Sequence, residues 1–156
     1  AQLEVTLETI EVAFIQARNN GAVTVLNPAP ARNIPASLLA LANIVVPNET
    51  ESAAIGGTKN LLNLGVATVV TTLGADGASI DTATSTTHIA PHKVTPIDTV
   101  GAGDAFIGAT CAELSRGASI EDAARMGAIA GALATTVKGA VPSLPTRQAV
   151  LAAQKS

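Results

Sequence analysis

The stretch DTVGAGDAFIGA, from Asp98 to Ala109, combines a Gly-Ala-Gly turn with an aspartate, Asp104, at the start of an expected helix. Gly101 and Gly103 have no Cβ atom, so the backbone can approach a ligand closely at these two positions. The free N–H groups of a helix N-terminus and the helix dipole together favour an anion such as a phosphate. The turn is therefore predicted to be an anion hole.

Asp104 lies inside this predicted anion hole, where its carboxylate is placed to accept a proton from a hydroxyl group. The N–H groups of Gly101, Ala102 and Gly103 would then stabilise charge on a phosphoryl group that is transferred to that hydroxyl. The alternative is purely structural: Asp104 caps the helix, and the glycines close a tight turn. The stretch matches neither the P-loop pattern nor a complete Gly-x-Gly-x-x-Gly dinucleotide fingerprint.

The length and composition indicate one globular domain over residues 1–156, because 47% of the residues are hydrophobic. A net charge of −3, with no cluster of Lys and Arg, argues against nucleic-acid binding. The single cysteine, Cys111, cannot form an internal disulfide, which favours a reducing compartment. No apolar run reaches the ~20 residues that span a bilayer, and the first residues lack a signal-peptide layout. We therefore expect a cytoplasmic protein without a membrane partner.

The elements that must position the turn alternate between helical and strand patterns. Short β-branched runs typical of buried parallel strands each follow a helical pattern, which predicts a layered α/β sheet. The expected helix and strand pairs are 7–22 with 22–30, 35–43 with 44–55, and 60–65 with 66–74.

The second half of the chain changes character after Gly77. Two short stretches, 78–83 and 87–94, are expected to form a hairpin or a pair of edge strands. Helices are expected over 104–116, over 119–137 with Ser119 as N-cap, and over 146–154. Two features do not fit a complete domain: residues 1–5 are strand-like with no preceding element, and 55–65 is short for a parallel crossover.

Six ordered motifs resemble those of the ribokinase-like carbohydrate kinases, also called the phosphofructokinase-B family. The C-terminal signature of that family, DTxGAGDxF, is matched at Asp98–Phe106. The other matches are QLE at 2–4, NPAPAR at 27–32, PNETE at 47–51, TLGADG at 72–77 and KGAVPSLP at 138–145. The resemblance covers nearly the whole chain and implies the C-terminal half of a three-layer α/β/α, Rossmann-like fold. The N-terminal half and the β-sheet lid of the family are absent from these 156 residues.

The resemblance implies an ATP-dependent kinase for a sugar primary hydroxyl, with D-ribose the favoured substrate and D-ribose 5-phosphate the product. Two alternatives stay open: another ribokinase-like sugar or nucleoside kinase, and a non-catalytic nucleotide-binding half-domain. Mg²⁺ and K⁺ are the implied cofactors, ATP and a small sugar the implied partners. Family members often dimerise through their lids, so a homodimer of the full-length protein is also considered.

The site residues carry over position by position. Asp104 resembles the catalytic base, and Gly101, Ala102 and Gly103 resemble the anion hole for the γ-phosphate. Glu4 corresponds to a sugar-contacting acid, and Glu51 to a ligand that holds Mg²⁺ through water. The nucleotide-binding positions are Asn48, Thr72, Gly74, Gly77 and Gly103. The monovalent-cation positions are Asp98, Val100, Ala134, Val137, Gly139 and Ser143.

Overall fold

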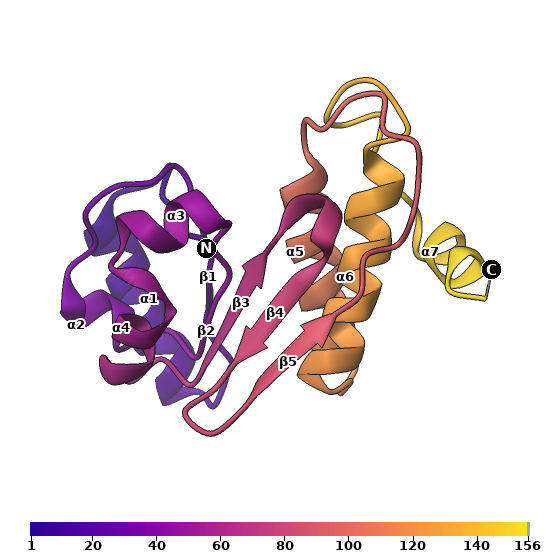
Figure 1. Ribbon diagram of the computed structural model, residues 1–156. Helices are drawn as coiled ribbons and strands as arrows, with labels where there is room; N and C mark the ends of the chain where they lie inside the picture. Colours follow the sequence, from indigo (N-terminus) through magenta and orange to yellow (C-terminus); the bar gives the residue numbers. More distant parts are fainter. Residues whose placement is uncertain (156) are drawn as a thin grey trace. The chain divides into compact units, whose positions relative to one another are not determined.

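The computed structural model describes residues 1–155 of the chain (Figure 1). Residue contacts divide the chain into two compact units. The first unit comprises Ala1–Leu73 and Ser79–Thr87, and the second comprises Gly74–Ala78 and the described residues from His88 onward. No helix within residues 1–155 is both long enough and apolar enough to cross a lipid bilayer.

Helices and strands alternate through the first unit, as the sequence predicts. In chain order they are α1 (Leu7–Asn19), β1 (Val25–Leu26), α2 (Ala36–Leu39), β2 (Ile44–Val45), α3 (Glu49–Ala54), α4 (Gly57–Asn63) and β3 (Thr68–Thr72). A short 3₁₀ turn, η1 (Gly74–Asp76), precedes β4 (Ala78–Asp81) and β5 (Thr86–Ile89).

The strands form a sheet in the order β1-β2-β3-β4-β5. β1 pairs with β2 and β2 pairs with β3 in parallel, which places Val25 opposite Ile44 and Ile44 opposite Thr68. β4 and β5 follow as a hairpin, in whose turn Thr82 N donates to Ser85 O at 2.9 Å. The predicted α/β sheet, with parallel strands first and a hairpin afterwards, is confirmed.

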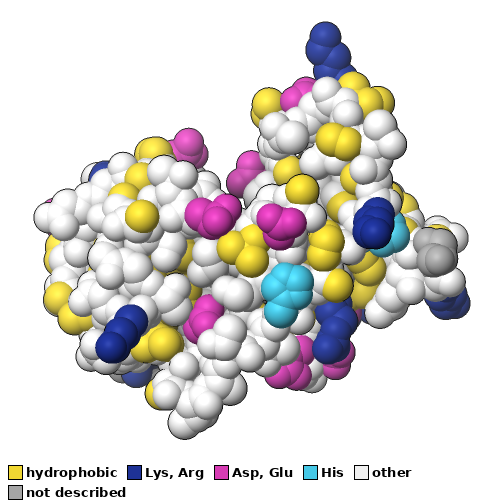
Figure 2. Space-filling view, in the orientation of Figure 1, with side chains coloured by type: hydrophobic (Ala, Val, Ile, Leu, Met, Phe, Trp, Pro, Cys, Tyr) yellow, Lys and Arg dark blue, Asp and Glu magenta, His cyan; other side chains and the backbone are white. Residues whose placement is uncertain are grey.

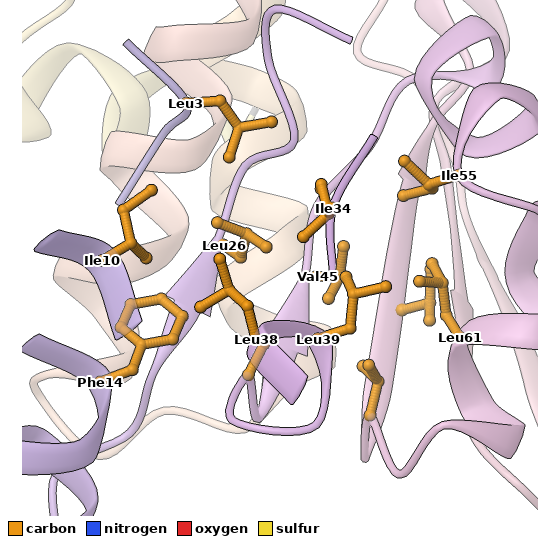
Figure 3. Close-up of a cluster of buried hydrophobic side chains, with 13 residues drawn as sticks. Leu3, Ile10, Phe14, Leu26, Ile34, Leu38, Leu39, Val45, Ile55 and Leu61 are labelled. Carbon is orange, nitrogen blue, oxygen red and sulfur yellow. The ribbon is translucent and has the colours of Figure 1, made fainter. Parts of the chain in front are cut away.

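The hydrophobic core of the first unit lies between its helices and its parallel strands (Figure 3). α1 contributes Ile10 and Phe14, which are one helical turn apart and therefore share a face of that helix. α1 begins where Thr6 caps the N–H of Thr9 and ends before Gly21, whose φ of 72° a side chain would disfavour. The other labelled core residues are Leu3, Leu26, Ile34, Leu38, Leu39, Val45, Ile55 and Leu61.

The expectation that the crossover before β3 is too short is wrong. α3 begins at Glu49, four residues after β2 ends, within the range 44–55 that the sequence assigns to a strand. α3 and α4 together make the connection, and Gly56 separates them with a left-handed φ of 91°. The polar residues of PNET favour a helix N-terminus over a continued strand, because they can bond to the free N–H groups there.

The prediction of strand-like structure at residues 1–5 is also not confirmed, because these residues form a turn. They are nevertheless hydrogen-bonded beside β1: Asn27 N donates to Ala1 O at 2.9 Å, and Leu3 N donates to Ala29 O at 2.8 Å. The side chain of Leu3 is only 2% exposed and belongs to the core. This segment is therefore fixed to the end of β1.

The second unit is built around three helices, α5 (Ala102–Leu114), α6 (Ile120–Ala134) and α7 (Arg147–Ala153). α5 and α6 cross closely, which requires glycine at two positions of α6. A Cβ atom on Gly127 would lie 2.2 Å from Thr110 Oγ1, and one on Gly131 would lie 3.0 Å from Ala102 O. The GAGD turn is thus packed directly against α6.

The ends of these helices follow local hydrogen bonds. Ser119 caps α6 by accepting from Asp122 N at 3.1 Å, as predicted. α6 ends at Ala134, three residues before the predicted end, and the hydroxyl of Thr135 bonds back to Ala132 O at 2.7 Å. α7 is tied to α5 by Arg147, which donates to the two carboxylate oxygens of Glu113 at 2.7 and 3.1 Å. These hydrogen bonds from Arg147 hold the pKa of Glu113 below its usual value.

Candidate active site

Asn48, Glu51 and Thr72 lie together at the carboxyl ends of β2 and β3. Asn48 forms a parallel bridge with Thr72, and Thr72 N donates to Pro47 O at 2.9 Å. In open α/β sheets, ligands bind outside the carboxyl ends of the strands. The first unit therefore brings three of the predicted site residues to the edge where a ligand is expected.

Asn48 and Glu51 also have a structural role that the sequence analysis did not identify. Asn48 Oδ1 accepts from Glu51 N at 2.8 Å, while Glu51 Oε2 accepts from Asn48 N at 2.9 Å. This reciprocal pair is a capping box that starts α3. The signal was present in the spacing, because a cap residue followed three positions later by Glu is the sequence signature of the box.

Glu51 keeps one carboxylate oxygen for another partner. Oε1 makes no hydrogen bond to any described residue, and only Oε2 is used in the cap. No group of three or more His, Cys, Asp or Glu side chains within residues 1–155 is arranged to hold a metal ion. A single free carboxylate oxygen fits Mg²⁺ that keeps most of its water, because this ion dehydrates reluctantly.

Glu4 lies beyond the carboxyl end of β1, next to the core residue Leu3. Its carboxylate is exposed and accepts a hydrogen bond from Gln2 at 2.8 Å. Leu3 N is bonded to Ala29 O, and Ala29 follows β1 in the chain. The candidate sugar-binding acid is therefore at the carboxyl end of a parallel strand, as Asn48 and Thr72 are.

The Gly-Ala-Gly turn, the predicted anion hole, lies at the N-terminus of α5 in the second unit. Gly101 precedes α5 with a φ of 83°, and Ala102 and Gly103 are the first two residues of the helix. The N–H groups of Gly101, Gly103 and Asp104 make no hydrogen bond to any described residue, whereas Ala102 N donates to Thr99 O at 3.3 Å. A Cβ atom on Gly103 would meet no atom within 4 Å, so the space beside that backbone is open.

Asp104 is the third residue of α5, and its side chain is exposed. It forms no hydrogen bond or ion pair within residues 1–155, although most other acidic side chains of the second unit are paired. Its side chain therefore does not cap the helix by a hydrogen bond, which was the structural alternative. A free carboxylate beside free N–H groups can accept a proton while those groups bind an anion.

Asp98 joins the segment before the turn to the loop after α6. Its carboxylate accepts from Gly139 N at 2.9 Å and from Val100 N at 3.0 Å. Both N–H groups lower the pKa of Asp98 below its usual value, and the larger effect comes from Gly139 N. Ile97 N and Asp98 N both donate to Thr135 O, at 2.7 and 3.0 Å. Segments 41 residues apart are thereby held together.

Most of the predicted cation-binding positions gather around this connection. Ser143 N donates to Gly139 O at 3.2 Å, and Ser143 Oγ donates to Ala140 O at 2.8 Å. Ala134 is fully buried at the end of α6, whereas Val137 is 43% exposed. Both carboxylate oxygens of Asp98 accept main-chain N–H groups, so a monovalent cation at these positions would bind mainly main-chain carbonyl oxygens. Such a hard ion prefers oxygen ligands.

The connection between Asp98 and Gly139 should weaken only when the pH falls below the range in which an aspartate usually titrates. Because the folded-state pKa of Asp98 is lowered, its contribution to stability is present above the unfolded-state pKa and is lost as the pH falls through the folded-state pKa. We expect Asp98→Asn to reduce the stability difference between pH 7 and pH 3, measured by urea unfolding. An unchanged pH dependence in the variant would contradict this role of Asp98.

Gly74 and Gly77 form the turn between β3 and β4. Gly77 N donates to Gly74 O at 3.3 Å, and a Cβ atom on Gly77 would lie 2.1 Å from Ile89 O. Gly77 also has a φ of 89°, so no other residue fits this position without strain. His88 fixes the turn to β5 through a 2.9 Å hydrogen bond between Nε2 and Asp76 O.

A groove of about 380 Å³ runs along α5 in the second unit and was not predicted. Asp104 borders it, and the Glu113–Arg147 pair forms part of its wall. Most of its lining is apolar, with Ala105, Ala109, Met126, Leu144 and Val150 among the residues. On the face drawn in Figure 2, the Lys and Arg side chains lie apart from one another and form no single basic patch.

The structure thus divides the predicted site residues between the two units. Glu4, Asn48, Glu51 and Thr72 belong to the first unit. The second unit holds the two turn glycines Gly74 and Gly77, the predicted anion-hole turn with Asp104, and the predicted cation positions.

Comparison with known proteins identifies the class of protein to which this fold and these motifs belong. Residues 1–147 match the model of the pfkB family of carbohydrate kinases, and the chain is a member of that family. The open α/β sheet is accordingly an incomplete ribokinase-like fold, as the sequence predicts.

Within the family, the chain is similar to ribokinases. It is 40% identical to the ribokinase of Staphylococcus aureus (strain COL) over 163 residues, which cover 96% of this chain and 54% of that protein. It superimposes on the crystal structure of ribokinase from Thermotoga maritima with a TM-score of 0.89, at 31% identity, covering 99% of this chain and 55% of the other. For Arabidopsis thaliana ribokinase complexed with ribose and ATP, the TM-score is 0.92 at 28% identity, with the same coverage. The chain spans about half the length of the curated relatives that it matches.

Proposed function

We propose that the protein is an ATP-dependent carbohydrate kinase that phosphorylates a primary hydroxyl of D-ribose to give D-ribose 5-phosphate. The observation that carries this proposal is the carboxylate of Asp104, which has no partner among residues 1–155, beside the unbonded N–H groups of Gly101, Gly103 and Asp104. Family membership and the similarity to ribokinases support the same reaction. Residues 1–156 would be the nucleotide-binding and catalytic part.

In this mechanism Asp104 accepts the proton of the sugar hydroxyl as its oxygen attacks the γ-phosphorus of ATP. The bond from that phosphorus to the bridging oxygen breaks, and ADP leaves with the electron pair. The N–H groups of Gly101, Ala102 and Gly103 bind the phosphoryl oxygens, where negative charge gathers during the transfer. One turn of the chain would thus supply both the base and the charge stabilisation.

The remaining residues would bind and orient the two substrates. Glu4 would accept hydrogen bonds from sugar hydroxyls, as a carboxylate does strongly. Asn48, Thr72, Gly74 and Gly77 would line the nucleotide. Glu51 would hold Mg²⁺ through water, and the oxygen atoms around Asp98 would hold K⁺. When bound, these cations supply positive charge that offsets the charge on the phosphates.

A second candidate function is phosphorylation of a related sugar or riboside. The chain is also 32% identical to the deoxyribokinase of Salmonella typhi, and 37% identical over 118 residues to an aminoimidazole riboside kinase of Salmonella typhimurium. The site residues named above do not distinguish these substrates from D-ribose. Substrate choice therefore needs a direct measurement.

We expect the full-length protein to release ADP from ATP fastest with D-ribose, when D-ribose, 2-deoxy-D-ribose and aminoimidazole riboside are compared by kcat/KM. The assay contains Mg²⁺ and K⁺, and a reaction without sugar is the control. A higher kcat/KM for another sugar would replace D-ribose as the substrate. ATP binding without any sugar-dependent ADP release would instead favour a non-catalytic nucleotide-binding protein. The mass of the same sample in solution tests whether the full-length protein is a homodimer.

A further inference from the structure

The side chain of Gln2 holds Glu4 by two hydrogen bonds. Gln2 Nε2 donates to Glu4 Oε2 at 2.8 Å, and Gln2 Oε1 accepts from Glu4 N. One amide group thereby contacts both the backbone and the carboxylate of Glu4. The other carboxylate oxygen, Oε1, makes no hydrogen bond to any described residue.

The residue between them, Leu3, anchors this arrangement to the first unit. Its side chain is 2% exposed within the core, and its N–H is bonded to Ala29 O after β1. Gln2 and Glu4 are both exposed on either side of this anchor. The backbone position of Glu4 is therefore set by the core, whereas its carboxylate is oriented by Gln2.

An exposed glutamate has several rotatable bonds, and ordering them on ligand binding costs conformational entropy. A hydrogen bond to Gln2 restricts those rotations before the ligand arrives. The amide is neutral, so it orients the carboxylate without cancelling the charge that attracts hydroxyl donors. A lysine would neutralise that charge, and a second acid would repel the carboxylate.

We propose that Gln2 is a positioning residue that aims the carboxylate of Glu4 at the sugar and leaves Oε1 to accept its hydroxyl groups. This inference rests on the proposed role of Glu4 in sugar binding. Gln2 itself does not need to touch the sugar. Its effect should therefore appear in the KM for the sugar and not in the binding of ATP.

The test uses the full-length protein with the variants Gln2→Ala, Gln2→Glu and Glu4→Gln, each assayed for sugar-dependent ADP release. Loss of a hydrogen bond worth roughly 1 kcal/mol corresponds to about a fivefold change, so we expect Gln2→Ala to raise the sugar KM about three- to tenfold. Gln2→Glu should raise it further, because the second carboxylate repels Glu4. The KM for ATP and the melting temperature should stay near those of the wild type.

Gln16→Ala is the matched control, because Gln16 is an exposed glutamine on α1 whose side chain makes no hydrogen bond to a described residue. It should leave the sugar KM unchanged. If Glu4→Gln raises the sugar KM and Gln2→Ala does not, the positioning role is overturned while the proposed function stands. If Glu4→Gln has no effect, the sugar contact of Glu4 and the role of Gln2 are both overturned. Absence of sugar-dependent turnover in the wild type would refute the proposed function itself.

Discussion

Replacing Asp104 by asparagine in the full-length protein should lower the sugar-dependent kcat by about 10²- to 10⁴-fold, the usual contribution of a general base. Asparagine has nearly the same shape but cannot accept the proton of the hydroxyl. The side chain of Asp104 has no partner among residues 1–155, so its replacement breaks no hydrogen bond of the fold. The KM for ATP should therefore change little, and steady-state kinetics with varied ATP and sugar will measure both constants.

Asp122→Asn provides a control at the same helical position. Asp122 is the third residue of α6, as Asp104 is of α5, and both carboxylates lie near a helix N-terminus. Asp122 is also paired with Ser119 and Arg125, so its variant should lose some stability and no activity. Asp104→Asn should show the opposite pattern. Near-normal turnover in Asp104→Asn would remove Asp104 from the mechanism.

Gly103→Ala should reduce turnover while leaving the protein as stable as the wild type or more stable. Alanine is favoured over glycine inside a helix by about 1 kcal/mol, and a Cβ atom at this position would meet nothing within 4 Å. The new methyl group would instead occupy the open space where a phosphoryl group is expected. We expect kcat/KM for ATP to fall at least about tenfold, measured alongside thermal unfolding of the same samples.

Gly101→Ala separates this effect from damage to the fold. Gly101 has a φ of 83°, and a Cβ atom there would lie 3.1 Å from Ala140 Cα. A left-handed conformation costs an alanine about 1–2 kcal/mol, so this variant should lose both stability and turnover. Wild-type kinetics in Gly103→Ala would mean that no anion binds beside this backbone. A large loss of stability in Gly103→Ala would mean that the added Cβ atom clashes with the protein, so that the space beside this backbone is not open.

Local sequence patterns predicted most of the elements. The alternation of helical and strand patterns identified the α/β class, and Ser119 identified the start of α6. Four residues were enough to predict an anion hole at the GAGD turn, because the chemistry of such a site depends on consecutive N–H groups and on the absence of Cβ atoms. The capping box of Asn48 and Glu51 is equally local, and its three-residue spacing would have been enough to predict it.

The boundaries of the elements could be predicted less accurately than their types, because several signals compete within a few residues. Residues 44–55 contain a β-branched run and a helix start, and the structure gives two residues to β2 before α3 begins at Glu49. Residues 1–5 have strand-forming side chains, but the bond from Glu4 N to the Gln2 side chain is part of a turn there. In both places a side chain accepts a hydrogen bond from a nearby backbone N–H group. In a continued strand, that N–H group would instead donate to a neighbouring strand.

The sequence by itself determined the fold class and predicted the chemistry of the turn, since both depend on residue types at short spacing. Only the tertiary structure decided that Asp98 holds Gly139 and that Gly127 and Gly131 allow α5 to cross α6 closely. It also decided that the carboxylate of Asp104 has no partner among residues 1–155. These facts depend on residues that are distant in sequence, and their contacts arise only when the whole chain packs.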